Sequence, residues 1–255
     1  MADSELRQLE RSFRELGTIE AETAWLKARL QAGAVDQGSL ELAAYCGSRA
    51  ARQLVPSAPT APKRPLLFVR GFEADRDWGN VVRSRAGLAI ANLALERWFV
   101  LLPDDRFMAS AQDTLERWTL GERVEISALR DISWRIREAL NEQFVRGAVN
   151  PFTGVPGLSV AKASGRPLWR TYLTVLRGLE RDYVPQPTKG LTEAAFLASR
   201  LQEWFHGKDE AEAKRVVAER VRSEIMPWAL GYSDVVAERI EARKADCGAR
   251  SPEVE

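Results

Sequence analysis

Residues 85–121 constrain the fold most, because apolar side chains recur there at helical spacing in two adjacent segments. The apolar positions are Leu88, Ala91, Leu95, Trp98 and Leu102 in the first segment, and Met108, Ala111, Leu115 and Trp118 in the second. Steps of three and four place each set on one face of a helix. Pro103 cannot continue the first helix, and Asp104 and Asp105 suit the positive N-terminus of the second. Such a short connection predicts an antiparallel hairpin of two amphipathic helices.

A similar pattern returns near the end of the chain and suggests an internal duplication. The corresponding positions are Ala194, Leu197, Leu201 and Trp204, followed by Ala218, Val221, Ile225 and Trp228. Amphipathic hairpins resemble one another by default, so the spacing alone means little. The matched tryptophans, and the glycines Gly121 and Gly231 that end both second helices, favour a true repeat. We therefore predict an all-α fold, a helical bundle built from antiparallel helix hairpins.

The remaining segments predict a small helical module before this bundle. Apolar spacing indicates helices over 6–16 and 18–33, with Thr18 as an N-cap, and a third over 37–55 rich in small residues. Prolines follow at every third position. The predicted domains are an N-terminal helical module at 1–55, a proline-rich linker at 56–65, the bundle at 66–245 and a disordered tail at 246–255.

The linker has two readings. Prolines three residues apart suit the polyproline II helix, and Pro59, Pro62 and Arg64 form a P-x-x-P-x-R pattern that aromatic grooves can bind. The other reading is a semi-rigid spacer between two helical domains. We favour the spacer and keep these three residues as candidate partner contacts.

An arginine row marks the predicted helix 167–183. Arg170, Arg177 and Arg181 lie opposite its apolar face, with Arg166 in the same register and Lys162 shortly before it. Guanidinium groups can bind phosphate or carboxylate, so these five cations are a candidate site for phosphate or nucleic acid. Alternatively, the row is a solvated face neutralised by neighbouring glutamates, which we favour. The preceding stretch 149–165 carries no helical signal, and long irregular loops are often functional.

Recognisable catalytic or metal-binding patterns are absent from the sequence. His206 is the only histidine, so its Glu203-x-x-His206 unit cannot be paired into a di-iron site. Cys46 lies among small residues and reads as a buried packing residue. No nucleophile elbow, dinucleotide fingerprint or P-loop occurs. We single out no catalytic residue and expect no metal and no cofactor, and an enzyme with a carboxylate-lined cleft is the third alternative. We assign Trp98, Trp118, Trp204 and Trp228 to packing.

Composition completes the expectation. The formal net charge of +1 argues against a general polyanion binder, and no apolar run approaches the roughly 20 residues that cross a bilayer. The acidic N-terminus is unlike a secretory signal, so we expect a cytoplasmic protein. The leading hypothesis is a non-enzymatic adaptor or regulator that binds another protein. Phosphate or nucleic-acid binding through the arginine row is the alternative; no membrane association is expected.

Overall fold

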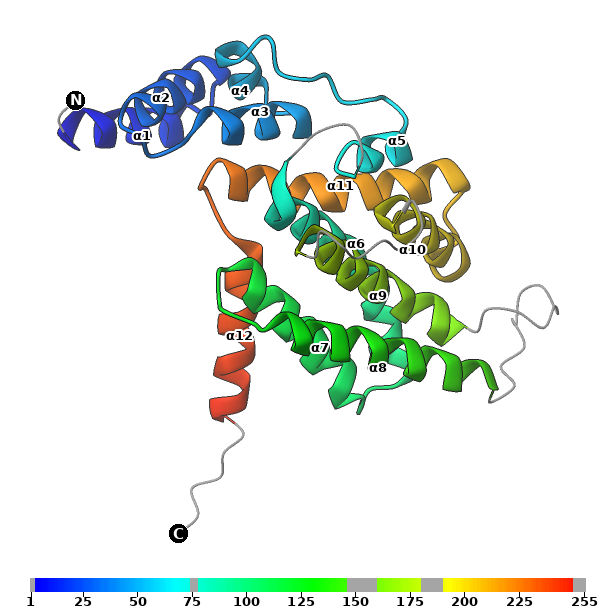
Figure 1. Cartoon of the computed structure of the whole chain (residues 1–255). Coiled ribbons are helices and arrows are strands. Elements are labelled where there is room, and N and C mark those ends of the chain that lie inside the picture. The colour runs from blue at the N-terminus through cyan, green and yellow to red at the C-terminus, as the bar shows by residue number, and fades with distance from the viewer. Residues whose placement is uncertain (1–2, 74–77, 146–159, 180–189, 250–255) are drawn as a thin grey trace. The chain divides into compact units, whose positions relative to one another are not determined.

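The computed structural model describes residues 3–73, 78–145, 160–179 and 190–249, and these ranges contain twelve helices and no strand (Figure 1). The predicted all-α class is confirmed. In chain order the helices are α1 (Asp3–Leu16), α2 (Ile19–Gln31), α3 (Gln37–Cys46), α4 (Arg49–Leu54), α5 (Pro65–Arg70), α6 (Gly79–Leu101), α7 (Arg106–Thr119), α8 (Ile126–Val145), α9 (Val160–Leu179), α10 (Gly190–His206), α11 (Glu210–Ala229) and α12 (Val235–Ala249).

Contacts divide the chain into two compact units, and the first of them is discontinuous. Unit 1 consists of Met1–Pro62 together with Arg222–Asp234, and unit 2 of Lys63–Val221 together with Val235–Glu255. The boundary after Pro62 falls within the predicted linker. Residues 222–234, which the sequence analysis places in the bundle, contact unit 1 instead. The last two turns of α11 therefore complete the N-terminal unit.

The predicted third helix over 37–55 is two helices, so this prediction is wrong. Gly47 ends α3 in the left-handed region at φ 112°. The Ser48 hydroxyl then caps α4 by accepting a hydrogen bond from the backbone N–H of Ala51 at 3.1 Å. Gly47 belongs to a run of small residues whose helical spacing continues across the break, and this continuity concealed the turn.

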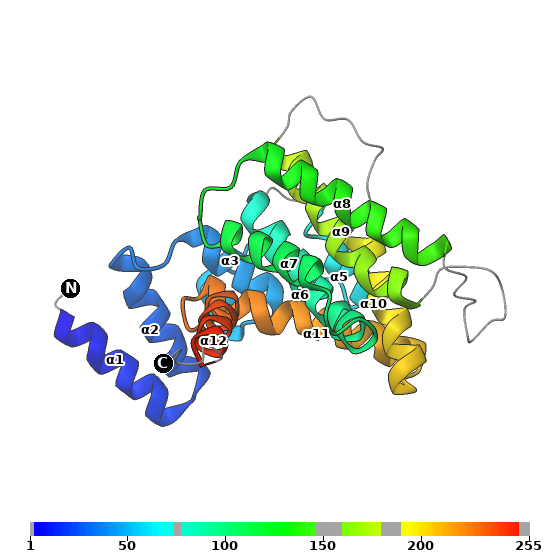
Figure 2. The same cartoon turned by 90° about the horizontal axis from the view of Figure 1, so that it is seen from below.

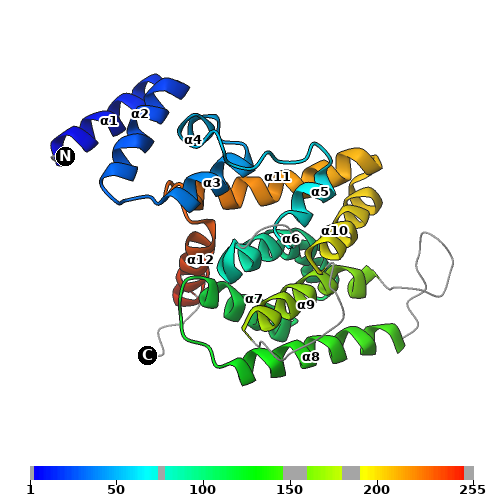
Figure 3. The same ribbon diagram turned by 45° about the horizontal axis from the view of Figure 1, so that its top comes forward.

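Helix α6 is the central element of unit 2, in contact with α7, α9 and α10 (Figures 2 and 3). The predicted apolar stripe from Leu88 to Trp98 is buried, but so are Ala89, Ile90 and Leu93 on its other faces. The expectation of one buried face is therefore wrong for this helix. Neighbours surround it because small residues such as Gly87 let other helices approach closely.

The core of unit 2 joins α6 to α7, α8 and α9, with α8 lying along α9 (Figure 2). Trp98 is fully buried, and its indole N–H donates to the Asp105 carboxylate at 3.0 Å. The other carboxylate oxygen of Asp105 accepts the Met108 backbone N–H at 3.1 Å and so caps α7, at the predicted start of this helix. Tyr172 of α9 donates its hydroxyl to the Ala111 carbonyl of α7 at 2.6 Å.

Helices α7 and α11 end in the same way. Gly121 and Gly231 both have positive φ, at 90° and 64°. The N–H after each glycine bonds five residues back, from Glu122 to Arg117 at 3.1 Å and from Tyr232 to Pro227 at 2.8 Å. This is the Schellman arrangement. The predicted helix ends are confirmed, whereas the duplication of the two hairpins stays a prediction.

Two other helix boundaries in the structure differ from those predicted. Helix α9 begins at Val160, so residues 160–165 are helical rather than part of a long loop, and Pro167 lies inside the helix. Helix α12 continues to Ala249, past the predicted end of the bundle at 245. The rest of the predicted loop (149–159) and of the predicted tail (250–255) lies outside the described residues.

Candidate functional site

A pocket of about 430 Å³ lies in unit 1 and is the candidate site. Its walls come from α1, from α2 and from the turn after α11. The lining residues are Leu6, Glu10, Phe13, Arg14, Trp25, Arg29, Gly231 and Tyr232. Both chain segments of the discontinuous unit 1 therefore contribute residues to the pocket lining.

Local sequence signals explain how α1 and α2 form two of the walls. Gly17 leaves α1 with φ 61°, and the Thr18 hydroxyl caps α2 by accepting the Ala21 N–H at 3.2 Å, as predicted. The connection is two residues long, which keeps α1 and α2 in contact. Trp25 and Arg29, four residues apart, share the face of α2 that lines the pocket.

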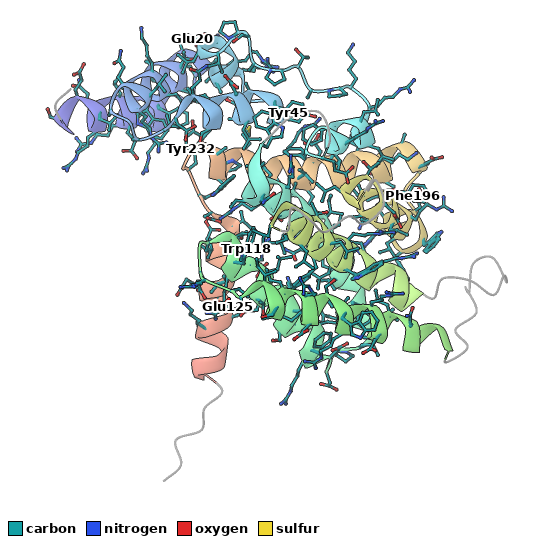
Figure 4. All side chains as sticks on the ribbon, in the orientation of Figure 1. Glu20, Tyr45, Trp118, Glu125, Phe196 and Tyr232 are labelled. Atoms are coloured by element: carbon teal, nitrogen blue, oxygen red, sulfur yellow. The ribbon has the colours of Figure 1, made fainter. Side chains whose placement is uncertain are left out.

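Three aromatic rings form the apolar wall. The centroid of Trp25 lies 5.2 Å from that of Phe13 and 5.3 Å from that of Tyr232. The Phe13 and Tyr232 centroids are only 5.9 Å apart, so the rings form a triangle instead of a sandwich around Trp25. Trp25 is buried, whereas Tyr232, labelled in Figure 4, is 37% exposed, so one edge of the cluster is open to solvent.

Charged groups hold the rings in place. The Arg29 guanidinium lies 4.9 Å from the Trp25 ring centroid and donates to the Leu230 carbonyl at the end of α11. The Tyr232 hydroxyl donates to Glu22 at 2.7 Å. Burial, followed by this hydrogen bond and the charge of Glu22, raises the pKa of Tyr232, which therefore stays protonated at neutral pH.

The rim of the pocket carries an ion pair. Glu10 and Arg14 lie 2.6 Å apart on α1, one helical turn from each other. The Arg14 side chain is 74% exposed, so the pair adds little stability but places both charges beside the aromatic wall. The lining therefore combines an apolar aromatic wall with an ion pair at its rim.

The candidate arginine row is only partly described. Arg170 pairs with Glu193 of α10 at 2.6 Å and lies 4.9 Å from the Trp169 ring centroid, so it acts within the fold. Arg166 is half-buried on α9. The backbones of Lys162 and Arg177 are helical, and their side chains, like all of Arg181, lie outside the described residues.

The linker motif is partly anchored. Arg52 donates to the carbonyls of Ala58 and Pro59, the latter at 2.7 Å. Pro59 and Pro62 are half-buried, and Arg64 is exposed just before α5. The anchoring favours the spacer reading over a freely presented docking motif.

The other chemistry-bearing residues take the roles expected of structural side chains. Cys46 is buried, and desolvation raises the pKa of its thiol to about 12. His206 ends α10, with Gly207 in the left-handed region behind it.

Trp98 is in the core, and Trp118 packs against the same core (Figure 4). Trp204 and Trp228 are half-buried. Among the described side chains, no three of His, Cys, Asp and Glu are grouped to hold a metal ion.

Phe13 and Trp25 lie within the predicted helices 6–16 and 18–33, and Gly231 lies at a predicted helix end, but no sequence pattern brings the three together. Tyr232 and Arg29 were missed, because about 200 residues separate them and no local pattern links them. The aromatic residue directly after a predicted C-terminal glycine was the only available signal.

Comparison with models of protein families, with curated proteins and with solved structures finds no match to this chain. No helix in the described part of the chain has the length and apolar character needed to cross a membrane. The chain is an all-α protein with an aromatic pocket in a discontinuous N-terminal unit.

Proposed function

We propose that this chain is a non-enzymatic adaptor that binds another protein, and that the unit 1 pocket receives an apolar side chain of a partner peptide. The observation that carries the proposal is the triangle of Phe13, Trp25 and Tyr232 along a pocket of about 430 Å³. Rigid aromatic rings that are partly exposed are typical of binding hot spots.

The surface next to the pocket favours a peptide over a compact small molecule. Leu6 and Phe13 line the pocket, and Leu16, the next member of the same helical stripe, is 66% exposed. The apolar strip therefore continues along α1 beyond the pocket, and an extended or helical peptide could cover it. The one carboxylate in the lining, Glu10, is ion-paired with Arg14.

The proposal is tested by panning a peptide display library against the immobilised full chain. Enriched peptides are then measured by fluorescence anisotropy against Phe13→Ala and Tyr232→Ala. We expect each substitution to weaken binding about tenfold or more, because each removes a hot-spot ring.

Phe196→Ala is the matched control. Phe196 is an exposed aromatic residue of α10 in unit 2, 45% accessible, and does not line the pocket (Figure 4). Its loss should leave the affinity unchanged. Failure to enrich any peptide, or equal weakening by Phe196→Ala, would contradict the proposal.

The alternative, phosphate or nucleic-acid binding through the arginine row, has weaker support. The Arg170–Glu193 pair already occupies one of its guanidinium groups. A nucleic-acid site would show affinity that falls steeply with added salt. Binding of a labelled oligonucleotide over a range of salt concentrations distinguishes it from the peptide site.

A further inference from the structure

The carboxylate of Glu116 on α7 is fully buried and is held by side chains from two other helices. Asn92 of α6 donates to it at 3.3 Å. Arg239 of α12 donates its Nε–H at 2.9 Å, and Arg243 of α12 also binds it. A buried carboxylate is strongly destabilising unless cations and hydrogen bonds compensate it. The α7 surface therefore requires the arginines that α12 supplies.

Helices α7 and α12 match in the spacing of their side chains as well as in charge. Asp113, one turn before Glu116 on α7, accepts a hydrogen bond from Arg243 at 3.0 Å. Val236 and Ile240 of α12 are 2% and 3% exposed. Positions 236, 240 and 243 share one helix face, so α12 presents a single surface of aliphatic and guanidinium groups.

The route of the chain makes α12 a separable part of unit 2. The chain leaves unit 2 after Val221, passes through unit 1 as residues 222–234, and returns at Val235. The α12 helix is thus covalently joined to the rest of unit 2 only through a segment of unit 1. The α7 surface can hold this helix from any chain that presents it, which is the condition for exchange of an element between copies.

We propose that the surface formed by Asp113 and Glu116 of α7 with Asn92 of α6, called here the Glu116 surface, binds α12 of a second copy of this chain. The resident α12 and the α12 of a second copy compete for it. Intramolecular binding has the advantage of high effective concentration, so exchange increases with protein concentration. The occupant is defined by its pattern, two arginines one turn apart beside two buried aliphatic residues.

The first experiment asks whether α12 binds in trans. The receptor is the full chain with Arg239→Gln and Arg243→Gln, which weakens its own α12, and the probe is a fluorescein-labelled peptide of residues 235–245. We expect saturable binding by anisotropy, and binding about tenfold or more weaker for the peptide with both arginines replaced by glutamine. Absence of saturable binding to a receptor with unchanged circular dichroism would overturn the proposal.

Arg243→Gln alone provides a second receptor in case the double variant does not fold. The Arg243 side chain is 38% exposed and so lies nearer the solvent than Arg239. The same peptide and the same glutamine control are used. Equal binding of the two peptides would show that the guanidinium groups do not direct recognition and would also overturn the proposal.

The second experiment measures mass by light scattering over a range of protein concentrations. The wild-type chain should show a dimer fraction that rises with concentration, and a chain that ends at Asp234, which lacks α12, should show none. Glu125→Gln is a control that should leave the dimer fraction unchanged, because the Glu125 side chain is 72% exposed on the connection before α8. A wild-type chain that is monomeric throughout, or a dimer fraction that persists in the chain without α12, would refute exchange.

Discussion

Asp105 performs two tasks with one carboxylate. One oxygen accepts the Trp98 indole N–H and the other caps α7 through the Met108 N–H. Asp105→Ala should therefore lower the free energy of unfolding by about 2–3 kcal/mol, because it removes a cap and leaves a buried donor without its partner. Asp104→Ala is the control: Asp104 is exposed, and the change should be within about 0.5 kcal/mol. Urea unfolding measures both, and equal losses would contradict this role.

Cys46 should be chemically silent in the folded chain. Its thiol is buried, and desolvation raises its pKa to about 12, so almost no thiolate forms at pH 8. In a Cys247→Ser chain, which reports Cys46 alone, a chromogenic disulfide reagent should react only after denaturant is added. Rapid labelling of the native protein would show that α3 opens readily.

Roles that depend on near neighbours in sequence were predictable residue by residue. The cap by Asp105, the end of α11 at Gly231 and the burial of Cys46 follow from a few adjacent side chains. The buried charge of Glu116 did not, because its partners lie more than 120 residues away on α12. A glutamate on a helix reads as solvent-exposed until the arginines that compensate it are known.

Among the helices, the packing of α6 depends on Gly87. A Cβ at this position would lie 2.6 Å from Thr171 of α9 and 3.0 Å from Leu191 of α10. Gly87→Ala should lower the free energy of unfolding by about 1–3 kcal/mol, although alanine is the better helix former, because overpacking outweighs propensity.

A double variant tests the cause of that loss. Adding Thr171→Ala removes the two nearest atoms and should recover most of the stability, so the two substitutions should be strongly non-additive. Thermal unfolding of the four chains in the cycle measures the coupling. Additive effects would show that the close approach of α6 and α9 is not what limits position 87.

Glu73 gives the N-terminus of α10 a pH-dependent partner. Its carboxylate accepts the Leu191 N–H and, at 2.6 Å, the Thr192 hydroxyl. Burial raises its pKa above the usual 4.5, with the hydrogen bonds from Thr192 and Leu191 and the charge of Arg70 acting in the opposite direction. The folded chain therefore binds this proton more tightly than the unfolded chain does.

The raised pKa of Glu73 determines the direction in which the stability of the folded chain changes with pH. Protonation of Glu73 stabilises the folded state below pH 4.5, and this contribution is lost as the pH rises through the raised pKa. The stability of the wild-type chain relative to Glu73→Gln should fall over that interval and then stay constant. Urea unfolding at several pH values measures the difference. A relative stability that rises with pH would contradict the prediction.

Helix existence was predictable, whereas several helix boundaries were not. Apolar spacing identified α6, α7, α10 and α11, because each repeats its pattern over several turns. The break at Gly47 was hidden in a stripe of small residues, and Pro167 was taken for a helix start although α9 continues before it. Small residues and an internal proline are compatible with more than one backbone course until neighbouring helices select one.

For the molecule as a whole, unit 1 should survive a cut in the linker. It is built from both Met1–Pro62 and Arg222–Asp234, so cleavage at the exposed Lys63 and Arg64 leaves its contacts intact. A chain with a site-specific protease sequence inserted at this point should remain one species in gel filtration after complete cleavage. Denaturant should separate the fragments. Separation without denaturant would show that residues 222–234 contribute little to the unit.

The discontinuity of unit 1 was the property least accessible to sequence. Each of its parts has ordinary helical spacing, and the apolar spacing of α11 continues from its turns in unit 2 into those in unit 1. Membership is decided by long-range contacts such as the stacking of Tyr232 on Trp25 and the bond from Arg29 to Leu230. The four prolines of the linker also predicted that the N-terminal unit ends there, whereas residues 222–234, much later in the chain, belong to this unit as well.

The same discontinuity sets an order of events during synthesis. About 160 residues separate the two parts of unit 1, so at roughly 5–20 residues per second the ribosome needs about 8–32 s to reach the second part after the first. During that interval α1 and α2 lack the Gly231–Tyr232 wall, and the rings of Phe13 and Trp25 have no third partner. The nascent chain therefore carries an open aromatic surface that it must shield from other chains until the end of α11 emerges. The aromatic wall that begins with Phe13 is therefore complete only after Tyr232 has been synthesised.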